Sequence, residues 1–154
     1  LTDSSLTKWL AQRIQKANIS SEHLVFTMDE AHVVNQLKSA KTLFSGLKEL
    51  HCQIVLDNFG TGLNPFQLVK HIQPDFIRIN TAFMKELSSN TDNQASIKSL
   101  TDQASSMEIS SIIPRVEDAS ILSVLWTVGA DFVQGGFLQK PAKTMNYDFS
   151  SMSG

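Results

Sequence analysis

The sequence predicts an α/β fold built on a parallel sheet, and three observations lead to that prediction. Short apolar stretches typical of buried strands alternate with longer stretches whose apolar residues recur at helical spacing. The strand-like stretches begin about 20 to 35 residues apart, which leaves room for a helical crossover between parallel strands. Polar residues directly follow these stretches, at the edge where parallel α/β sheets bind ligands. The pattern fits both an open sheet and part of a closed barrel.

The first predicted element is an amphipathic helix that ends near Asn18, because its apolar residues share one face. These residues are Leu6, Trp9, Leu10, Ile14 and Ala17. The stretch LVFTM is short, apolar and β-rich, so we expect a strand that is buried on both faces. A helix is expected from about Val33 to Leu50, with its apolar residues facing inward. The inward residues are Val34, Leu37, Ala40, Leu43, Phe44, Leu47 and Leu50.

The middle of the chain continues the alternation. QIVLD is predicted as a second buried strand that runs into a glycine-bearing turn at 58–62. A short helix is expected at 65–71, followed by FIRIN as the third strand. A further helix is expected around 82–87, before a polar loop at 88–93.

The last third of the chain holds two more strand-like stretches. Ile97, Leu100, Ala104 and Met107 mark a long helix, which precedes ISSIIP as the fourth strand. A helix at 119–128 follows, with Ile121, Leu122, Leu125 and Val128 on its apolar face. DFVQG is predicted as the fifth strand.

Composition narrows the classes of protein and partner. The 154 residues, 42% of them hydrophobic, are enough for one soluble domain with a single core. A net charge of -2 gives no basic field, which argues against nucleic acid and anionic membranes as partners. The single Cys52 excludes an internal disulfide and a cysteine-rich zinc site. Because no membrane helix or signal peptide is visible, we expect a cytoplasmic protein. It begins with Leu1 rather than Met, so we expect a piece of a longer chain.

Three segments resemble one family. LDNFGTGLNPFQLVKHIQPDFIRINTAFMKEL is similar to the stretch around the paired aspartates of the EAL domain of cyclic di-GMP phosphodiesterases. PRVEDASILSVLWTVGADFVQGGFLQKP resembles that family's segment from EGVE to its C-terminal FSKP, and LVFTMDE resembles its LELEITE. The resemblance implies the C-terminal portion, about strands 4 to 8, of a (β/α)8 TIM-type barrel whose upstream strands would carry the EAL motif.

The same resemblance divides the chain into three parts. The segment 1–20 would be the helix before strand four, 23–141 the strand–helix repeats, and 142–154 a C-terminal tail. A GGDEF domain is expected upstream in the full-length chain. Cutting a barrel open exposes strand edges, so self-association is also expected.

Hydrolysis in this family relies on two divalent cations, Mg²⁺ or Mn²⁺, which need hard oxygen ligands. Three positions where the family has acidic residues hold Thr27, Asn58 and Pro114, none of which can replace a carboxylate. Arg78 stands where the family has a catalytic lysine, and a guanidinium, which stays protonated in proteins, cannot act as a general base. We therefore expect an inactive phosphodiesterase homologue with no catalytic residues, no metal ligands and no cofactor.

The positions that survive point to nucleotide binding, as in the noncatalytic, FimX-like receptors of the family. The residues expected to bind cyclic di-GMP are Asp57, Arg78, Arg115, Glu117, Gln134 and Phe137. The residues expected to support the adjoining loop are Glu30, Phe59, Gly60, Thr61 and Gly62. The resemblance also implies a PilZ-domain protein as a signalling partner, as in some relatives, and a role in the regulation of type IV pili and twitching motility.

Each expected contact has a simpler alternative. Asp57 can cap the turn that follows it, and Glu117 can cap the helix that begins near Ala119. Arg115 can be an ordinary exposed arginine, and Phe137 can belong to the core. The function also has two rivals: an active cyclic di-GMP phosphodiesterase that uses Mg²⁺ or Mn²⁺, and a protein-interaction scaffold that binds no nucleotide.

Overall fold

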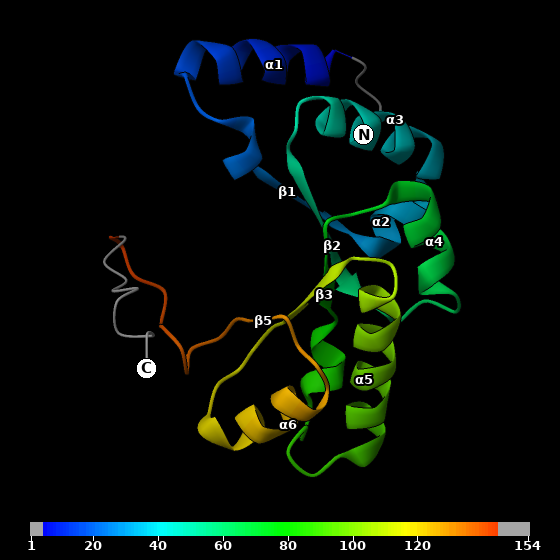
Figure 1. Ribbon diagram of the computed structural model, residues 1–154, viewed down its shortest axis with the longest axis vertical. Helices are drawn as coiled ribbons and strands as arrows, with labels where there is room; N and C mark the ends of the chain where they lie inside the picture. The colour runs from blue at the N-terminus through cyan, green and yellow to red at the C-terminus, as the bar shows by residue number, and fades with distance from the viewer. Residues whose placement is uncertain (1–4, 145–154) are drawn as a thin grey trace.

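The computed structural model describes residues 5–144, in which five parallel strands form one sheet in chain order (Figure 1). The strands are β1 (Val25–Asp29), β2 (Gln53–Phe59), β3 (Phe76–Ile79), β4 (Ser110–Ile113) and β5 (Phe132–Val133). Every neighbouring pair is parallel. The predicted α/β class and the parallel alternation of strands and helices are confirmed, and the sheet is that of a partial TIM-type barrel.

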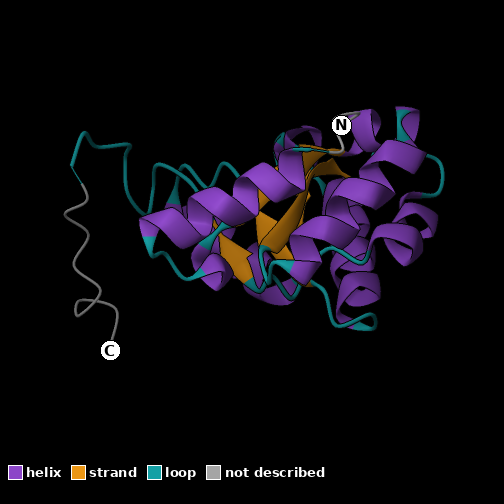
Figure 2. Cartoon of the chain, turned by 90° about the horizontal axis from the view of Figure 1, so that it is seen from above, coloured by secondary structure: helices purple, strands orange, loops and turns teal. Residues whose placement is uncertain are grey.

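Helices connect the strands and lie around the sheet when the molecule is seen from above (Figure 2). The α-helices are α1 (Leu6–Ala17), α2 (Glu30–Asn35), α3 (Leu37–Glu49), α4 (Pro65–Ile72), α5 (Thr91–Ser105) and α6 (Leu122–Thr127). Three 3₁₀ turns, η1 (Ser21–His23), η2 (Thr81–Met84) and η3 (Ala119–Ile121), complete the elements. Of the predicted C-terminal tail, 145–154 lie outside the described residues.

One face of the sheet is covered by helices and carries the core. Residues that alternate along the strands point toward α3, α4 and α5, which follow one another along that side in Figure 1. Ile54 and Leu56 of β2 and Ile77 of β3 are fully buried there. Phe44 and Leu47 of α3 pack into the same cluster, as their predicted inward positions require.

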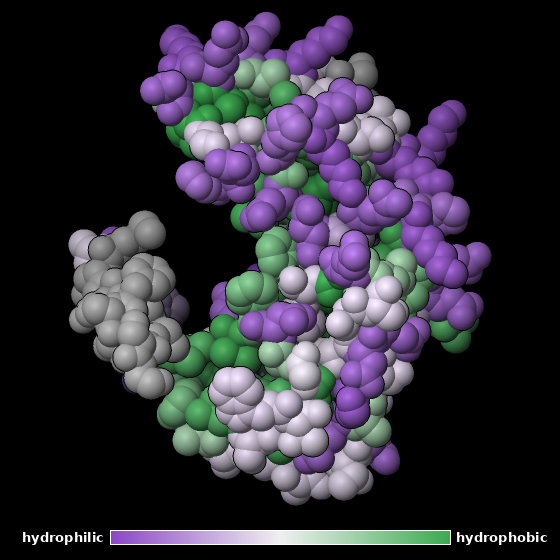
Figure 3. Space-filling view, in the orientation of Figure 1, coloured by the Kyte–Doolittle hydropathy of each residue, from purple (hydrophilic) through white to green (hydrophobic). Residues whose placement is uncertain are grey.

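The opposite face is called the open face below. Strand register and alternation assign twelve residues to it. These are Val25, Thr27, Asp29, Gln53, Val55, Asp57, Phe76, Arg78, Ser110, Ile112, Phe132 and Gln134. The molecule is hollowed on the side away from α4 and α5 (Figure 3). The prediction that LVFTM is buried on both faces is therefore wrong: Val25 is 51% exposed, because β1 is an edge strand with one uncovered face.

Several predicted helices differ in detail. The helix expected at 33–50 is interrupted at Gln36, whose φ of −131° is not helical, so α2 and α3 are separate. Because α2 buries Glu30 and Val33 instead, Val34 is 57% exposed rather than inward. The helix expected at 82–87 is the 3₁₀ turn η2. The loop expected at 88–93 is shorter than predicted, because α5 already begins at Thr91. The helix expected at 119–128 divides into η3 and α6.

β2 extends two residues beyond its predicted end, through a bulge at the carboxyl edge. Three steps along β2, from Leu56 to Phe59, face two steps along β3, from Ile77 to Ile79. Asn58 takes up the extra residue with a left-handed φ of 53°, a conformation that asparagine tolerates better than most side chains. The bulge redirects the Asp57 and Asn58 side chains at the point where the polar residues gather.

Candidate functional site

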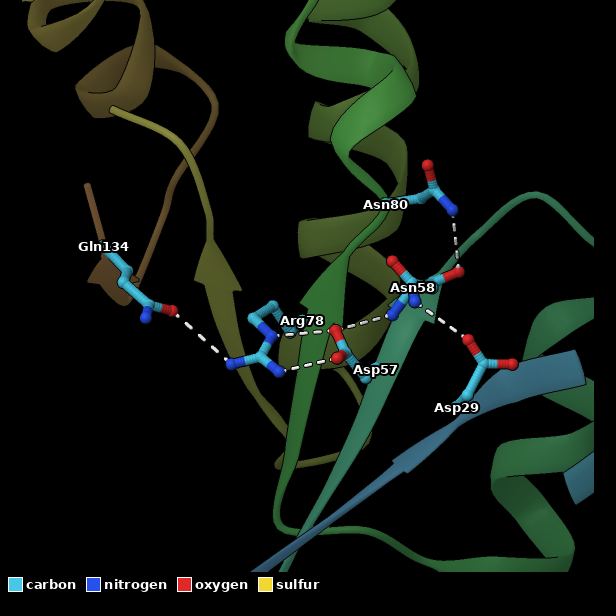
Figure 4. Close-up of polar contacts among 6 residues, drawn as sticks. All are labelled: Asp29, Asp57, Asn58, Arg78, Asn80 and Gln134. Carbon is cyan, nitrogen blue, oxygen red and sulfur yellow. Dashed lines mark hydrogen bonds and ion pairs between the residues drawn. The ribbon is translucent and has the colours of Figure 1, made fainter. Parts of the chain in front are cut away.

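A chain of polar side chains crosses the open face at the carboxyl ends of four strands (Figure 4). It runs from Asp29 on β1 through Asn58 and Asp57 on β2 to Arg78 on β3, and on to Gln134 directly after β5. Parallel strands bring these residues together although 105 positions separate the first from the last (134 − 29). The prediction that strand-end residues meet at one edge is confirmed for this set.

The ion pair of Asp57 and Arg78 is the centre of this network. Arg78 Nη2 donates to Asp57 Oδ2 at 2.6 Å, and Arg78 Nε donates to Asp57 Oδ1 at 2.8 Å. Both side chains are about a quarter exposed, so the pair is only partly screened by water. The Arg78 hydrogen bonds lower the pKa of Asp57 against the opposing effect of burial, and the same bonds raise the pKa of Arg78. Asp57 is therefore a charged partner of Arg78 as well as the acceptor of the Asn58 backbone N–H.

Asn58 links this pair to Asp29. Its Nδ2 donates to Asp29 Oδ2 at 2.8 Å, and this hydrogen bond is the main reason that the pKa of Asp29 is lowered. The other Asp29 oxygen caps α2 by accepting from the backbone N–H groups of Ala31 and His32. Asn80 Nδ2 donates to the Asn58 carbonyl at 3.3 Å, which fixes the bulge from the side of β3.

Arg78 keeps part of its hydrogen-bonding capacity for a ligand. Asp57 takes Nε and one N–H of Nη2, which form one edge of the planar guanidinium. Nη1 lies 3.5 Å from Gln134 Oε1, a long contact that a charged acceptor can displace. The second edge, formed by Nη1 and Nη2, can therefore bind two oxygens of a phosphate while the first edge stays on Asp57.

A cavity of about 720 Å³ opens onto this network. Five of the six predicted ligand residues line it: Asp57, Arg78, Arg115, Glu117 and Gln134. The wall is completed by residues that the sequence did not single out as ligand contacts, among them Thr81, Gln139 and the cationic Lys140. The volume lies within the range of pockets for small molecules and cofactors. A larger hollow of about 1040 Å³ lies between α4 and α5, away from the network, and is lined mostly by neutral residues.

Phe137, the sixth residue expected to bind the nucleotide, is not among the residues that line this cavity, so its role as a contact stays a prediction. Its backbone N–H donates to the Val116 carbonyl at 3.0 Å, and its side chain is 42% exposed. The core alternative is wrong, because Phe137 is not among the residues packed in the hydrophobic cluster.

The segment after β4 and the segment after β5 pair through backbone hydrogen bonds and together form one wall of the cavity. The Val116 N–H donates to the Gln134 carbonyl at 3.0 Å, and the Val116 carbonyl accepts from Phe137. Gly135 is necessary at this crossing, because a Cβ there would lie 2.1 Å from the Val116 oxygen. A Cβ on Gly136 would lie 2.7 Å from Glu117 Oε2, so the glycine pair leaves room for the Glu117 carboxylate.

Arg115 lies in this wall with a backbone φ of 57°. A non-glycine residue pays a steric cost in the left-handed region, and such residues cluster at functional sites. The Arg115 side chain is exposed and lines the cavity. Glu117 does not cap the next helix, because that role belongs to Asp118, whose carboxylate accepts from the Ser120 N–H.

The loop after β2 is tied to the buried Glu30 at the start of α2. Glu30 Oε2 accepts from the Gly60 N–H at 3.0 Å, and the Thr61 N–H also bonds to this carboxylate. Burial raises the pKa of Glu30, while these two hydrogen bonds oppose the rise. Gly60 has a φ of 103°, and a Cβ there would lie 2.6 Å from Leu100. These contacts are those that the expected supporting role of Glu30 requires.

Comparison with known proteins identifies what the chain is similar to. The family model described as EAL domain matches residues 1–141. The FimX EAL domain from Pseudomonas aeruginosa, solved bound to c-di-GMP, superimposes with a TM-score of 0.91 and 41% identity over 96% of this chain and 60% of that one. The FimX EAL domain from Xanthomonas citri, also in complex with c-diGMP, gives a TM-score of 0.90 and 27% identity over 96% of this chain and 58% of that one.

Among curated proteins, cyclic di-GMP phosphodiesterase PdeF from Escherichia coli K12 is 27% identical over 86% of this chain. The match covers 18% of that protein, so the chain spans less than a fifth of its length. The chain likewise spans about three-fifths of the solved FimX domains.

The residues present do not fit the pair of divalent cations that the resemblance to phosphodiesterases implies. Both Asp57 oxygens accept from a guanidinium, and Asp29 is used by Asn58 and by the α2 backbone. Thr27 lies on the open face with no carboxylate to offer, and Pro114 lines the cavity wall. Within the described part of the chain, no three His, Cys, Asp or Glu residues gather in a way that could hold a metal ion. No described helix is long and apolar enough to cross a membrane.

Proposed function

The chain belongs to the EAL domain family, and we propose that it is a cyclic di-GMP receptor that binds the nucleotide without hydrolysing it. The observation that carries this proposal is the Arg78 guanidinium, held by Asp57 with its second edge available in the cavity. The FimX domains solved with this nucleotide, one of them 41% identical over nearly the whole chain, support the choice of ligand.

The charges around the cavity suit a dianionic ligand with two phosphodiester groups. Arg78, Arg115 and Lys140 contribute three positive charges, and Asp57 and Glu117 contribute two negative ones. Arg78 and Arg115 approach from neighbouring strands, so each can bind a phosphate or stack on a guanine. Glu117 can accept from the ring N–H and the amino group of guanine through its two carboxylate oxygens, which the cationic side chains of the cavity cannot do.

Hydrolysis is not expected, because Arg78, Asp57 and Asn58, which stand at the family's lysine and paired aspartates, are poorly suited to activate a water molecule. Arg78 stays protonated at any physiological pH and cannot remove a proton. Asp57 is a weak base, since its hydrogen bonds with Arg78 lower its pKa. Asn58 donates its amide to Asp29, so it behaves as a structural link.

Calorimetric titration of cyclic di-GMP into the chain tests the proposal. We expect binding, and we expect Arg115→Ala to weaken it by about tenfold through the loss of a charged contact. Arg13→Ala is the matched control, because Arg13 lies over Trp9 on α1, outside the cavity lining. Absence of heat up to high micromolar nucleotide would favour a protein-interaction scaffold and overturn the proposal.

The rival enzymatic function is tested on the same samples. PdeF and other relatives are named as cyclic di-GMP phosphodiesterases, so turnover with Mg²⁺ or Mn²⁺ is assayed by chromatography of the nucleotide. We expect no linear dinucleotide, and steady product formation would assign this chain to the active enzymes. A PilZ-domain partner and an upstream GGDEF domain stay predictions from the resemblance.

A further inference from the structure

We infer that the Arg78 guanidinium takes the place of a divalent cation at this sheet edge, so that the chain supplies its own positive charge and excludes a metal ion. The inference concerns the protein before any nucleotide is bound. It rests on the proposed function only in its second experiment, where the nucleotide is the probe.

The carboxylate oxygens that a metal ion would need at this edge are already occupied by hydrogen bonds. A divalent cation such as Mg²⁺ or Mn²⁺ requires about six oxygen ligands in near-octahedral geometry. Asp57 lines the cavity, and both of its oxygens accept charged hydrogen bonds from Arg78, of 2.6 and 2.8 Å. A metal ion can bind Asp57 only by displacing Arg78 from one or both of these oxygens.

Electrostatic repulsion acts against a metal ion as well. Asp29 and Asp57 carry two negative charges on either side of Asn58, and Arg78 supplies one positive charge directly on Asp57. A metal ion bound to Asp57 would lie within a few ångströms of a guanidinium that cannot release its proton. Like charges at that separation repel strongly in a partly buried site, so the ion pair and the metal ion exclude each other.

Arg78 can also replace the cation as the partner of the ligand's phosphate. In metal-dependent phosphodiester chemistry the cation binds phosphate oxygens. The second edge of Arg78, facing Gln134, can bind a phosphate group in the same region through two parallel hydrogen bonds. A fixed guanidinium thereby holds the phosphate but generates no metal-bound hydroxide, which separates binding from hydrolysis.

The first experiment measures Mn²⁺ binding to the nucleotide-free chain by electron paramagnetic resonance. We expect wild type to leave the signal of free Mn²⁺ unchanged up to about 1 mM, the range of weak protein sites for divalent ions. Arg78→Gln removes the charge but keeps a polar side chain, and it should free Asp57 to bind Mn²⁺. Arg78→Ala is the second variant, and the unfolding transition of each variant shows whether it is folded.

Arg115→Ala is the matched control for charge. It removes one positive charge from the same cavity without freeing Asp57, so it should gain no Mn²⁺ site. Binding of Mn²⁺ by wild type at sub-millimolar concentration overturns the inference. Folded Arg78→Gln and Arg78→Ala proteins that bind no Mn²⁺ also overturn it, because Arg78 would then not be what excludes the metal.

The second experiment uses cyclic di-GMP as the probe. Wild type should bind it with the same affinity in EDTA and in millimolar Mn²⁺, whereas Arg78→Gln should lose about tenfold in EDTA and recover part of the loss in Mn²⁺. A wild-type affinity that rises with Mn²⁺ contradicts the inference. If wild type binds no nucleotide in either buffer, the proposed function fails, while the Mn²⁺ measurement on the free protein still decides the role of Arg78.

Discussion

Arg78 on β3 binds both carboxylate oxygens of Asp57 on β2, through Nε at 2.8 Å and Nη2 at 2.6 Å. The two residues lie on the open face, on strands that the Asp57–Asn58 bulge shifts relative to each other. The pair therefore has two consequences. It fixes the bulged end of β2 against β3, and it sets the direction in which the remaining edge of the guanidinium faces the cavity.

The pair should contribute a measurable coupling to stability. Asp57→Ala, Arg78→Ala and the double variant form a double-mutant cycle, with the free energy of unfolding measured in urea. We expect a coupling of about 1 to 2 kcal/mol, because the contact is bidentate and only a quarter exposed. Lys98 and Asp102, an i,i+4 pair with both side chains more than half exposed, serve as the reference and should couple by about 0.5 kcal/mol or less. If the effects of Asp57→Ala and Arg78→Ala on the free energy of unfolding are additive, the ion pair does not stabilise the folded chain and this prediction is wrong.

Asp57 should also make stability depend on acid pH. The pKa of Asp57 is lowered in the folded state, so its contribution is present above the unfolded value of about 4 and is lost as the pH falls through the lowered folded value. Wild type should therefore lose stability more steeply than Asp57→Asn on acidification below about pH 4. Urea unfolding at stepped pH measures this, with Asp102→Asn as the exposed control. Parallel curves for wild type and Asp57→Asn would show that the ion pair is not formed in solution.

Arg115 should lower the stability of the fold through its backbone conformation while it strengthens nucleotide binding through its side chain. Its φ of 57° favours glycine, so Arg115→Gly should stabilise the chain by about 1 kcal/mol while weakening nucleotide binding. Glu108→Gly is the matched control: Glu108 has a φ of 59° but lies in the turn after α5, outside the cavity lining. It should give a similar gain in thermal stability without loss of affinity. If Arg115→Gly binds the nucleotide as well as wild type does, Arg115 is not a ligand contact but an ordinary exposed arginine.

The uncovered edge of β1 should promote self-association. Val25 is 51% exposed on this edge strand, and unpaired strand edges template pairing with another chain. Val25→Lys should reduce the mass measured by light scattering at high protein concentration, because charged edge residues disfavour strand pairing. Val34→Lys, at a residue that is 57% exposed on α2, changes charge and hydrophobicity equally away from any strand. A wild-type chain that is monomeric throughout the concentration range contradicts this expectation.

The sequence predicted much of the fold because the spacing of apolar residues shows which side of each helix or strand is buried. The end of α1 at Asn18 and the start of α4 at Pro65 follow directly from apolar spacing and turn residues. The break at Gln36 was not predicted, since the apolar pattern continues across it and only the backbone conformation of that residue changes. The exposure of Val25 depends on which strands lie beside β1, and no local pattern carries that information.

The candidate site was predicted in part for similar reasons. The residues at strand ends could be chosen from their positions after apolar stretches, and five of the six line one cavity. The link from Asp29 to Asn58 was missed, because it depends on a bulge that turns Asn58 away from its regular strand direction. Phe137 was expected to contact the nucleotide from its position close to Gln134, and its 42% exposed side chain is not among those that line the cavity.

We propose that a fixed guanidinium on Asp57 lets this chain bind cyclic di-GMP without a metal ion. The most direct measurement is calorimetric titration of the nucleotide into wild type in EDTA and in millimolar Mn²⁺, with chromatography of the nucleotide afterwards. We expect one affinity in both buffers and intact cyclic dinucleotide at the end. Binding that requires Mn²⁺, or conversion to the linear dinucleotide, would contradict it.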